Sequence, residues 1–202
     1  MNGAERSEDV DRVVSMLRSA LPVTTGRCVL REVRVGDVEA VHAYRGLPEV
    51  TRYLGHPPLS REQVGELVAG WRKDRAAVTV VCEQDGQVVG DVRVWCRPSA
   101  AMRPATTRHV DAGLGYAFHP AVHGQGLATE SAGTVLELVL GPGGVRRVTA
   151  RVFAPATASA RLLARLGFTQ DGCDRAAVLA PDGLSWWDDQ LWSRLGAPAR
   201  MP

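Results

Sequence analysis

A glycine-rich turn that opens into a helix carries the clearest chemical signal in the sequence. Residues 121–130 read AVHGQGLATE, with Gly124 and Gly126 just before a run of helical character. Glycine allows tight curvature and close approach of the backbone to a ligand. The first N–H groups of a helix lack intrahelical partners and lie at the positive end of its dipole. This combination binds phosphate groups, so we expect the turn to hold a phosphorylated ligand.

Two other phosphate-binding motifs fit the turn poorly. A Walker A loop requires a lysine after its last glycine, and here Leu127 follows Gly126. The dinucleotide-binding fingerprint requires a third glycine, where this chain has Thr129. It also requires an acidic residue on the next strand, which here is rich in arginine. The sequence therefore excludes a Walker A loop and argues against a dinucleotide-binding fold.

A third pattern is supported along most of the chain. GLGYAFHPAVHGQGLATES (113–131) resembles the acyl-CoA-binding segment of the GCN5-related N-acetyltransferases, whose pattern is R/Q-x-x-G-x-G/A. His123, Gly126 and Ala128 stand at its three defined positions, with histidine in place of the usual Arg or Gln. RRVTARVFAPATASARLLARLGFTQDG (146–172) resembles the later family segment with its N-x-x-S motif and Gly-Phe. VLREVRVGDVEAV, PEVTRYLG and GQVVGDV resemble the earlier segments, so the resemblance covers residues 27–195 and is nearest to the branch that acetylates ribosomal-protein N-termini at alanine or serine.

The resemblance implies a particular fold. We expect an α+β domain with a mixed, mostly antiparallel sheet of six to seven strands, splayed central strands and about four flanking helices. An amphipathic helix precedes it, capped by Ser7, with Val10, Val13, Val14, Leu17 and Leu21 at helical spacing. This helix either packs on the domain or contacts a partner subunit. The predicted parts are an N-terminal helical extension (1–24), the N-acetyltransferase domain (25–196) and a disordered tail (197–202).

Acetyl-CoA is the co-substrate that the resemblance implies. In the family the pantetheine arm docks between the splayed strands, here near residues 116–122, and main-chain N–H groups near residues 125–129 hold the pyrophosphate. The cofactor-binding residues predicted in this way are Phe118, His119, Val122, His123, Gly124, Gln125, Gly126, Leu127, Ala128, Thr129, Ala156 and Ser159. Ala156 stands where the family has asparagine, which removes a side-chain contact to the pantetheine arm.

Acetyl transfer to an amine needs a route for the amine proton, donors for the tetrahedral oxyanion and a donor for the departing thiolate. Ser159 matches the family serine and is the predicted thiolate donor; capping a helix is its alternative role. The branch usually has a glutamate where this chain has Gly113. Asp111, His119 or His109 could replace that base, and each also has an ordinary structural interpretation.

The segment SWWDDQLW (185–192) has alternating faces if it is a strand. Trp187 then faces the same way as Leu191, and Trp186 the same way as Trp192. Core packing or a subunit interface is the first interpretation, and lining of an acceptor pocket is the second.

Composition limits the expected partners. The formal net charge is +2 without a basic stripe, so nucleic acid is not an expected partner. No run approaches the roughly 18 apolar residues of a membrane span, and no secretory signal precedes the domain. Four cysteines without a C-x-x-C pair predict buried, reduced thiols and no metal site. These features predict a cytoplasmic protein that does not bind membranes, and family analogy adds a homodimer through the last strands.

The function predicted from these residues is transfer of an acetyl group from acetyl-CoA to a primary amine, by direct attack in a ternary complex. The acceptor is either a protein N-terminus or a small-molecule amine. An acyl-CoA-binding module with little or no catalysis is the alternative, because Gly113 and Ala156 depart from the family near the chemistry.

Overall fold

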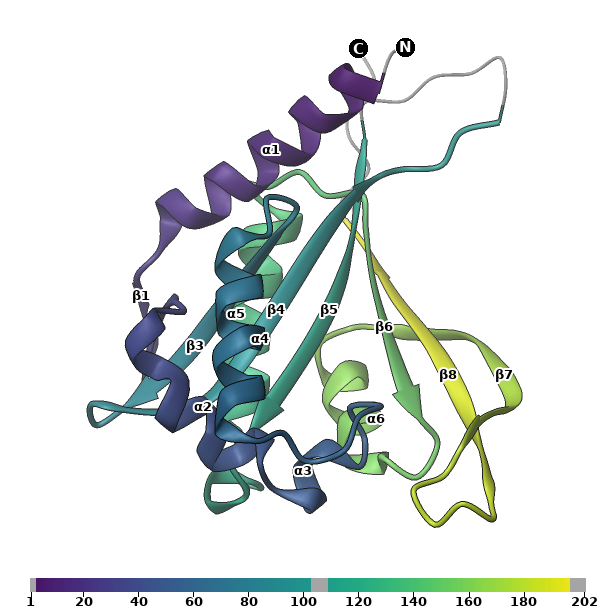
Figure 1. Ribbon diagram of the computed structural model, residues 1–202. Helices are drawn as coiled ribbons and strands as arrows, with labels where there is room; N and C mark the ends of the chain where they lie inside the picture. The colour runs from purple at the N-terminus through teal and green to yellow at the C-terminus, as the bar shows by residue number, and fades with distance from the viewer. Residues whose placement is uncertain (1–2, 103–108, 197–202) are drawn as a thin grey trace.

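The computed structural model describes residues 3–102 and 109–196, with side chains from residue 8 onward. One mixed sheet of eight strands forms the centre, in the order β1-β2-β3-β4-β5-β6-β8-β7 (Figure 1). Only the β5–β6 pair is parallel within this described sheet. The strands are β1 (Val23–Thr24), β2 (Val29–Glu32), β3 (Ala77–Gln84), β4 (Gln87–Pro98), β5 (Val110–Phe118), β6 (Arg147–Phe153), β7 (Thr169–Leu179) and β8 (Trp186–Leu195).

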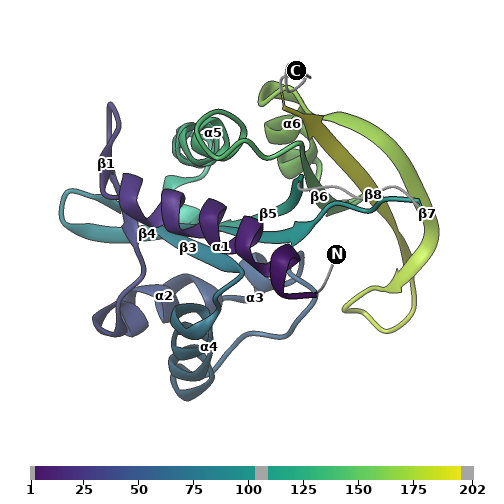
Figure 2. The ribbon, with the colours of Figure 1, turned by 90° about the horizontal axis from the view of Figure 1, so that it is seen from above.

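Helices cover both faces of the sheet, and each face has its own apolar core. Figure 2 shows α5 and α6 on one side of the sheet and α2, α3 and α4 on the other. The helices are α1 (Gly3–Ala20), α2 (Val38–Arg45), α3 (Pro48–Thr51), α4 (Arg61–Lys73), α5 (Leu127–Leu140) and α6 (Thr157–Arg165). The predicted α+β fold is confirmed, and the two-residue β1 at the edge brings the sheet to eight strands. The tail at 197–202 lies outside the described residues.

The N-terminal helix α1 packs on its own domain. It begins at Gly3, earlier than the predicted cap at Ser7. Val13, Val14 and Leu17 are 0%, 3% and 4% exposed and belong to the same core as α5, α6 and the sheet. The apolar spacing therefore reflects burial in the domain, which is the first of the two roles predicted for it.

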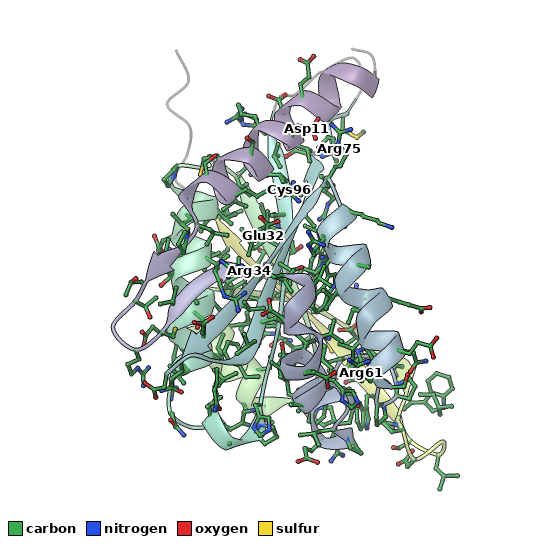
Figure 3. All side chains as sticks on the ribbon, turned by 60° about the vertical axis from the view of Figure 1, so that its left-hand side comes forward. Asp11, Glu32, Arg34, Arg61, Arg75 and Cys96 are labelled. Carbon is green, nitrogen blue, oxygen red and sulfur yellow. The ribbon has the colours of Figure 1, made fainter. Side chains whose placement is uncertain are left out.

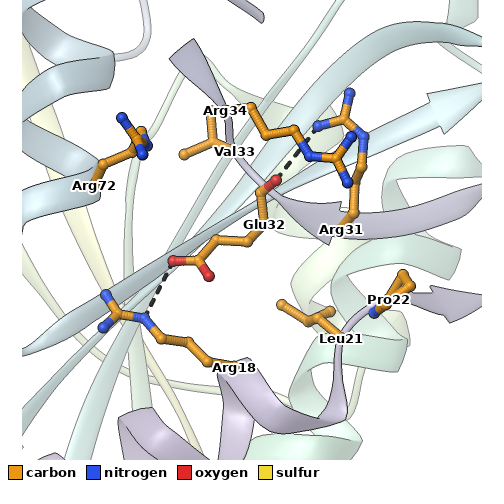
Figure 4. Close-up of a pocket in the computed structure, with 8 residues that line it drawn as sticks. All are labelled: Arg18, Leu21, Pro22, Arg31, Glu32, Val33, Arg34 and Arg72. Atoms are coloured by element: carbon orange, nitrogen blue, oxygen red, sulfur yellow. Dashed lines mark hydrogen bonds and ion pairs between the residues drawn. The ribbon is translucent and has the colours of Figure 1, made fainter. Parts of the chain in front are cut away.

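Arginine side chains lie in the space between α1, β2 and α4. Figure 4 shows Arg18 of α1 beside Glu32 of β2, with an N–O distance of 3.1 Å. The Arg18 guanidinium also donates to the carbonyl oxygens of Asp74 and Ala77 at 3.1 and 3.3 Å. A pocket of about 410 Å³ remains between these elements, and Arg34 and Arg72 also face into it (Figure 4). Glu32 and Arg34 lie below α1 in Figure 3, and no residue of the glycine turn lines this pocket.

We expect replacement of Leu17 by alanine to lower the free energy of unfolding by about 2–5 kcal/mol, because it leaves a cavity between α1 and the sheet. Ser15→Ala is the matched control, since Ser15 lies on the exposed side of the same helix. Urea denaturation of both variants checks the prediction. Equal midpoints for Leu17→Ala and the wild type would show that α1 contributes nothing to the core.

Candidate active site

The central feature of the site is the separation of β5 from β6. The two strands pair only at Asp111–Arg147, Ala112–Val148 and Gly113–Thr149. Beyond those pairs β5 runs on to Phe118 and β6 to Phe153, and Figure 1 shows them diverging toward α6. The predicted splay of the central strands is confirmed. Beyond Gly113, this edge of β5 has no partner strand within the described residues.

Main-chain groups near the end of β5 point into this opening. The N–H of His119 donates to the Val89 carbonyl of β4 at 2.8 Å, so the Phe118 carbonyl faces the opposite way, into the splay. Alternation along the strand turns the N–H and C=O of Tyr116 the same way. The His123 Nε2 atom lies 2.9 Å from the Phe118 oxygen. His123 therefore holds the end of the open edge, a contact that the motif position alone did not indicate.

The glycine turn has the geometry that its sequence predicts. Gly124 and Gly126 have φ values of +75° and +82°, which L side chains rarely adopt. Gly126 is the N-cap of α5, and its carbonyl accepts the first helical hydrogen bond from Glu130 at 3.0 Å. Within the described chain, no acceptor binds the N–H groups of Leu127, Ala128 and Thr129. The Leu127 side chain is buried, so only its main chain faces the turn.

An arginine from the β1–β2 loop lies against this turn. Arg27 contacts Glu130 through Nε and NH2 at 2.7 and 2.6 Å, and its guanidinium also donates to the Gln125 carbonyl. A Cβ added to Gly126 would lie 3.3 Å from Arg27 NH2. A guanidinium from a distant segment thus lies at the turn, where it neutralises the charge of Glu130. Nothing in the local pattern of the sequence indicated this.

Ser159 lies beside the splay and bonds to a tyrosine of β5. Its Oγ atom is 2.7 Å from the Tyr116 hydroxyl, and it does not cap α6. Burial raises the pKa of Tyr116 to about 12, against the opposing effect of the Ser159 hydrogen bond. The phenol therefore keeps its proton at neutral pH and can donate to Ser159 Oγ, which leaves the serine hydrogen free for another acceptor. Ala156, the N-cap of α6, offers no side-chain cap.

Asp111, a predicted base, is held elsewhere. Its carboxylate accepts from Ser99 Oγ at 2.6 Å and from Arg146 at 3.0 and 2.8 Å. It is 6% exposed and lies where β5 and β6 are still paired. His109 precedes β5 at the same end. The structure therefore does not bring Asp111 to the opening, and its burial is explained by the Arg146 ion pair.

The other predicted residues lie nearer the opening. His119 accepts from the Ala121 N–H at 3.1 Å through Nδ1, which caps the short 3-10 turn Pro120–Val122. The predicted cofactor-binding residues fall at the end of β5, in the glycine turn, in the first turn of α5 and at the start of α6, namely at Phe118, His119, Val122, His123, Gly124, Gln125, Gly126, Leu127, Ala128, Thr129, Ala156 and Ser159. The open end of the splay thus brings these segments to one place.

The indole of Trp95 fills the space that a side chain at position 113, where the family has a glutamate, would need. A Cβ at Gly113 would overlap the ring of Trp95 from β4, and one at Gly115 would lie 3.5 Å from it. Trp95 pairs with Gly113 across the ladder and is 40% exposed. A carboxylate side chain therefore cannot occupy position 113 in this packing. The departure from the family at Gly113 has a steric reason.

A cleft of about 800 Å³ lies between the α3 segment and the β7–β8 hairpin. Its lining includes Pro48, Arg52 and Pro57 on one side and Phe153, Leu179 and Trp187 on the other. The Trp187 ring lies 5.7 Å from that of Tyr53 and 6.2 Å from that of Phe153. Trp186, on the opposite face of β8, is 60% exposed. Of the two interpretations of the tryptophan segment, Trp187 thus fits the lining of a pocket.

The remaining sequence expectations concern thiols, metals and membranes. Cys28, Cys82 and Cys96 are buried, whereas Cys173 is exposed because β7 is an edge strand. Burial raises the pKa of Cys96 to about 11, so it remains a thiol. The described residues contain no group of three or more His, Cys, Asp or Glu side chains that could hold a metal ion. No helix in the described ranges is both long and apolar enough to span a membrane.

Comparison with known protein families identifies the family to which the chain belongs. The sequence model of the acetyltransferase (GNAT) domain matches residues 27–169. The chain belongs to the GNAT acetyltransferase family. It is an N-acetyltransferase with acetyl-CoA as co-substrate, which favours the enzyme over a binding module.

Relatives of this GNAT acetyltransferase cover most of its length. The uncharacterized N-acetyltransferase YnaD of Bacillus subtilis (strain 168) is 22% identical over 174 residues, 86% of this chain and 96% of YnaD. A structure of RimL, a ribosomal L7/L12 α-N-protein acetyltransferase in complex with coenzyme A, has a TM-score of 0.70 at 20% identity and covers 86% of this chain and 97% of its own. The spermidine N-acetyltransferase of Vibrio cholerae has a TM-score of 0.70 at 17% identity, with 85% and 96% covered. These structures share the fold.

We expect Gly113→Ala to lower the free energy of unfolding by about 1–3 kcal/mol, because its methyl group overpacks against Trp95. In a Trp95→Ala background the same change should have little effect, since the indole is gone. Thermal or urea denaturation of the two single variants and the double variant gives the coupling. Additive effects of the two substitutions would contradict the contact.

Proposed function

We propose that this GNAT acetyltransferase moves the acetyl group to a primary amine by direct attack in a ternary complex. The observation that carries the proposal is the opening between β5 and β6, with Ser159 and Tyr116 beside it and the cleft at Phe153 at its end. A thioester lying in that opening would have a proton donor on one side and room for an amine on the other. Both reactants would then be held within reach of each other.

The open edge of β5 suits the pantetheine arm. Unpaired main-chain groups on a strand edge need partners, and the amides of the arm would supply a donor for the Tyr116 carbonyl and an acceptor for the Phe118 N–H. The pyrophosphate would then rest on the N–H groups of residues 125–129 at the start of α5. Arg27 adds a guanidinium at this turn, held in place by Glu130.

The proposed reaction begins with the lone pair of the neutral amine on the thioester carbonyl carbon. The oxyanion that forms would accept a hydrogen bond from the Tyr116 N–H, which faces the splay. Collapse of the tetrahedral intermediate breaks the C–S bond, and the thiolate of coenzyme A takes a hydrogen bond from Ser159. The amine loses its proton to water in the open cleft, because Trp95 fills the site of the family carboxylate.

Two names among the related structures indicate two acceptor classes, a ribosomal-protein N-terminus and a polyamine. Each name belongs to a protein no more than 20% identical to this chain. Either a protein N-terminus or a small amine therefore stays within the proposed function. The homodimer through the last strands and the cytoplasmic location stay predictions.

Replacement of Gly126 by valine should raise the Kd for coenzyme A by about tenfold or more. The side chain would crowd Arg27 and cover the N–H groups that face the pyrophosphate, at a φ of +82° that strains any L residue. Gly86→Val is the matched control, since Gly86 has a φ of +78° in the open β3–β4 turn. Isothermal titration with coenzyme A separates the two. Undiminished affinity in folded Gly126→Val would remove the turn from the binding site.

Ser159→Ala should lower kcat by about 100-fold with an unchanged Kd for acetyl-CoA, because it removes the proposed thiolate donor. Tyr116→Phe should lower kcat by about tenfold, since Ser159 loses its partner.

Because the pKa of Tyr116 is about 12, wild-type kcat should not fall as the pH rises to about 10, the ordinary pKa of tyrosine. Thiol release from acetyl-CoA with saturating amine measures each value.

Thr157→Ala, at the exposed first residue of α6, is the control for the Ser159 variant. Wild-type turnover in Ser159→Ala would exclude it from the mechanism. Acetyl-CoA binding without thiol release on a broad amine panel would instead favour the acyl-CoA-binding module.

A further inference from the structure

We propose that the acceptor is a small monoamine on an aromatic or bulky apolar group, bound in the cleft against Phe153 and Trp187. The inference rests on the proposed function and names the acceptor class of that site. It sets this chain apart from enzymes that bind a polycation. The argument uses the position of the cleft, its rings and its charges.

The cleft meets the open end of β6 at Phe153, which lines it. Phe153 is the last residue of β6, so its ring stands where the two strands are farthest from their shared pairs. It pairs with Asp189 across the ladder to β8, and the Trp187 ring lies 6.2 Å away on the same face. An amine bound against these two rings would therefore lie at the end of β6, where the strands have separated. A volume of about 800 Å³ is within the range of small-ligand pockets.

The walls of the cleft are mainly apolar. Val178 and Leu179 from β7 and the prolines of the α3 segment lie opposite or beside the two rings. Leu179 is 47% exposed, although it lines the cleft. Tyr53 packs against Trp187 at a ring distance of 5.7 Å and fixes its orientation. Rings at such distances present faces on which an aromatic or flat apolar group can stack.

Nearby acidic groups differ in how far their charge is compensated. Asp189 Oδ2 pairs with Arg151 at 2.7 Å, on the face that carries Phe153, whereas its buried Oδ1 has no hydrogen-bond partner in the described chain. Asp182 lines the cleft, but its carboxylate accepts from Ser185 Oγ at 2.6 Å and from the Leu184 N–H at 2.8 Å. The side chain of Glu49, the other carboxylate of the lining, has no hydrogen bond or ion pair within the described chain.

An arginine offsets part of the negative charge of the lining. Arg52 also lines the cleft, with its guanidinium 5.0 Å from the centre of the Tyr53 ring. A polyamine carries several charges that must all be compensated when they leave water. The carboxylates of Glu49 and Asp182 and the guanidinium of Arg52 together leave the lining one negative charge, which matches one ammonium group. The charge pattern therefore selects a monoamine, and the rings select its apolar body.

The test compares acceptors at saturating acetyl-CoA, with thiol release as the readout. The probes are 2-phenylethylamine, ethylamine, spermidine and a short peptide with an N-terminal alanine. We expect kcat/KM for 2-phenylethylamine to exceed that for each of the others by tenfold or more. A preference for spermidine or for the peptide would overturn the inference and leave the proposed function intact. Absence of turnover with every amine would overturn both.

Variants of Trp187 and Phe153 test whether the preference for an aromatic acceptor depends on these two rings. Trp187→Ala should raise the KM for 2-phenylethylamine about tenfold while the KM for acetyl-CoA stays the same. Phe153→Leu keeps an apolar side chain and should give a smaller rise in the same KM. Trp186→Ala is the matched control, since this neighbouring indole is 60% exposed on the other face of β8. Equal KM values for the Trp186 and Trp187 variants would overturn the inference.

Discussion

The short ladder between β5 and β6 is the constraint on which the rest of the site depends. A parallel pair that continued to Phe118 would satisfy the main chain of both strands and leave no opening. Three residue pairs hold the strands together, and the next residues separate around the pair formed by Tyr116 and Ser159. The unpaired edge, the proton donor and the path to the cleft all arise from this one departure from regular pairing.

Charge around the glycine turn is balanced by residues from distant parts of the chain. A helix N-terminus with free N–H groups attracts an anion, and Glu130 in its first turn would oppose that attraction. Arg27 neutralises this glutamate and contacts the Gln125 carbonyl. The loop between β1 and β2 thereby fixes the shape of a turn on which the proposed pyrophosphate site depends.

The sequence predicted features that depend on local geometry or on a family pattern. Gly124 and Gly126 indicated the turn and the start of α5, because only glycine adopts those φ values freely. Alternation in the tryptophan segment placed Trp187 and Trp186 on opposite faces of β8. Contacts between distant segments were not predictable, because spacing along one element says nothing of what packs against it. Tyr116 with Ser159 is such a contact, and Asp111 with Arg146 is another.

The ladder between β5 and β6, along the opening, has fewer residue pairs than the ladders on either side of it. β4 and β5 share nine residue pairs and β6 and β8 share seven, whereas β5 and β6 share three. The β6–β8–β7 part is therefore joined to the larger part of the sheet by those three pairs and by side chains of β6 and α6 in the shared core. Local opening follows the boundaries between cooperative units. Amide hydrogens of β7 and β8 should then exchange with solvent as one unit, faster than those of β3 and β4.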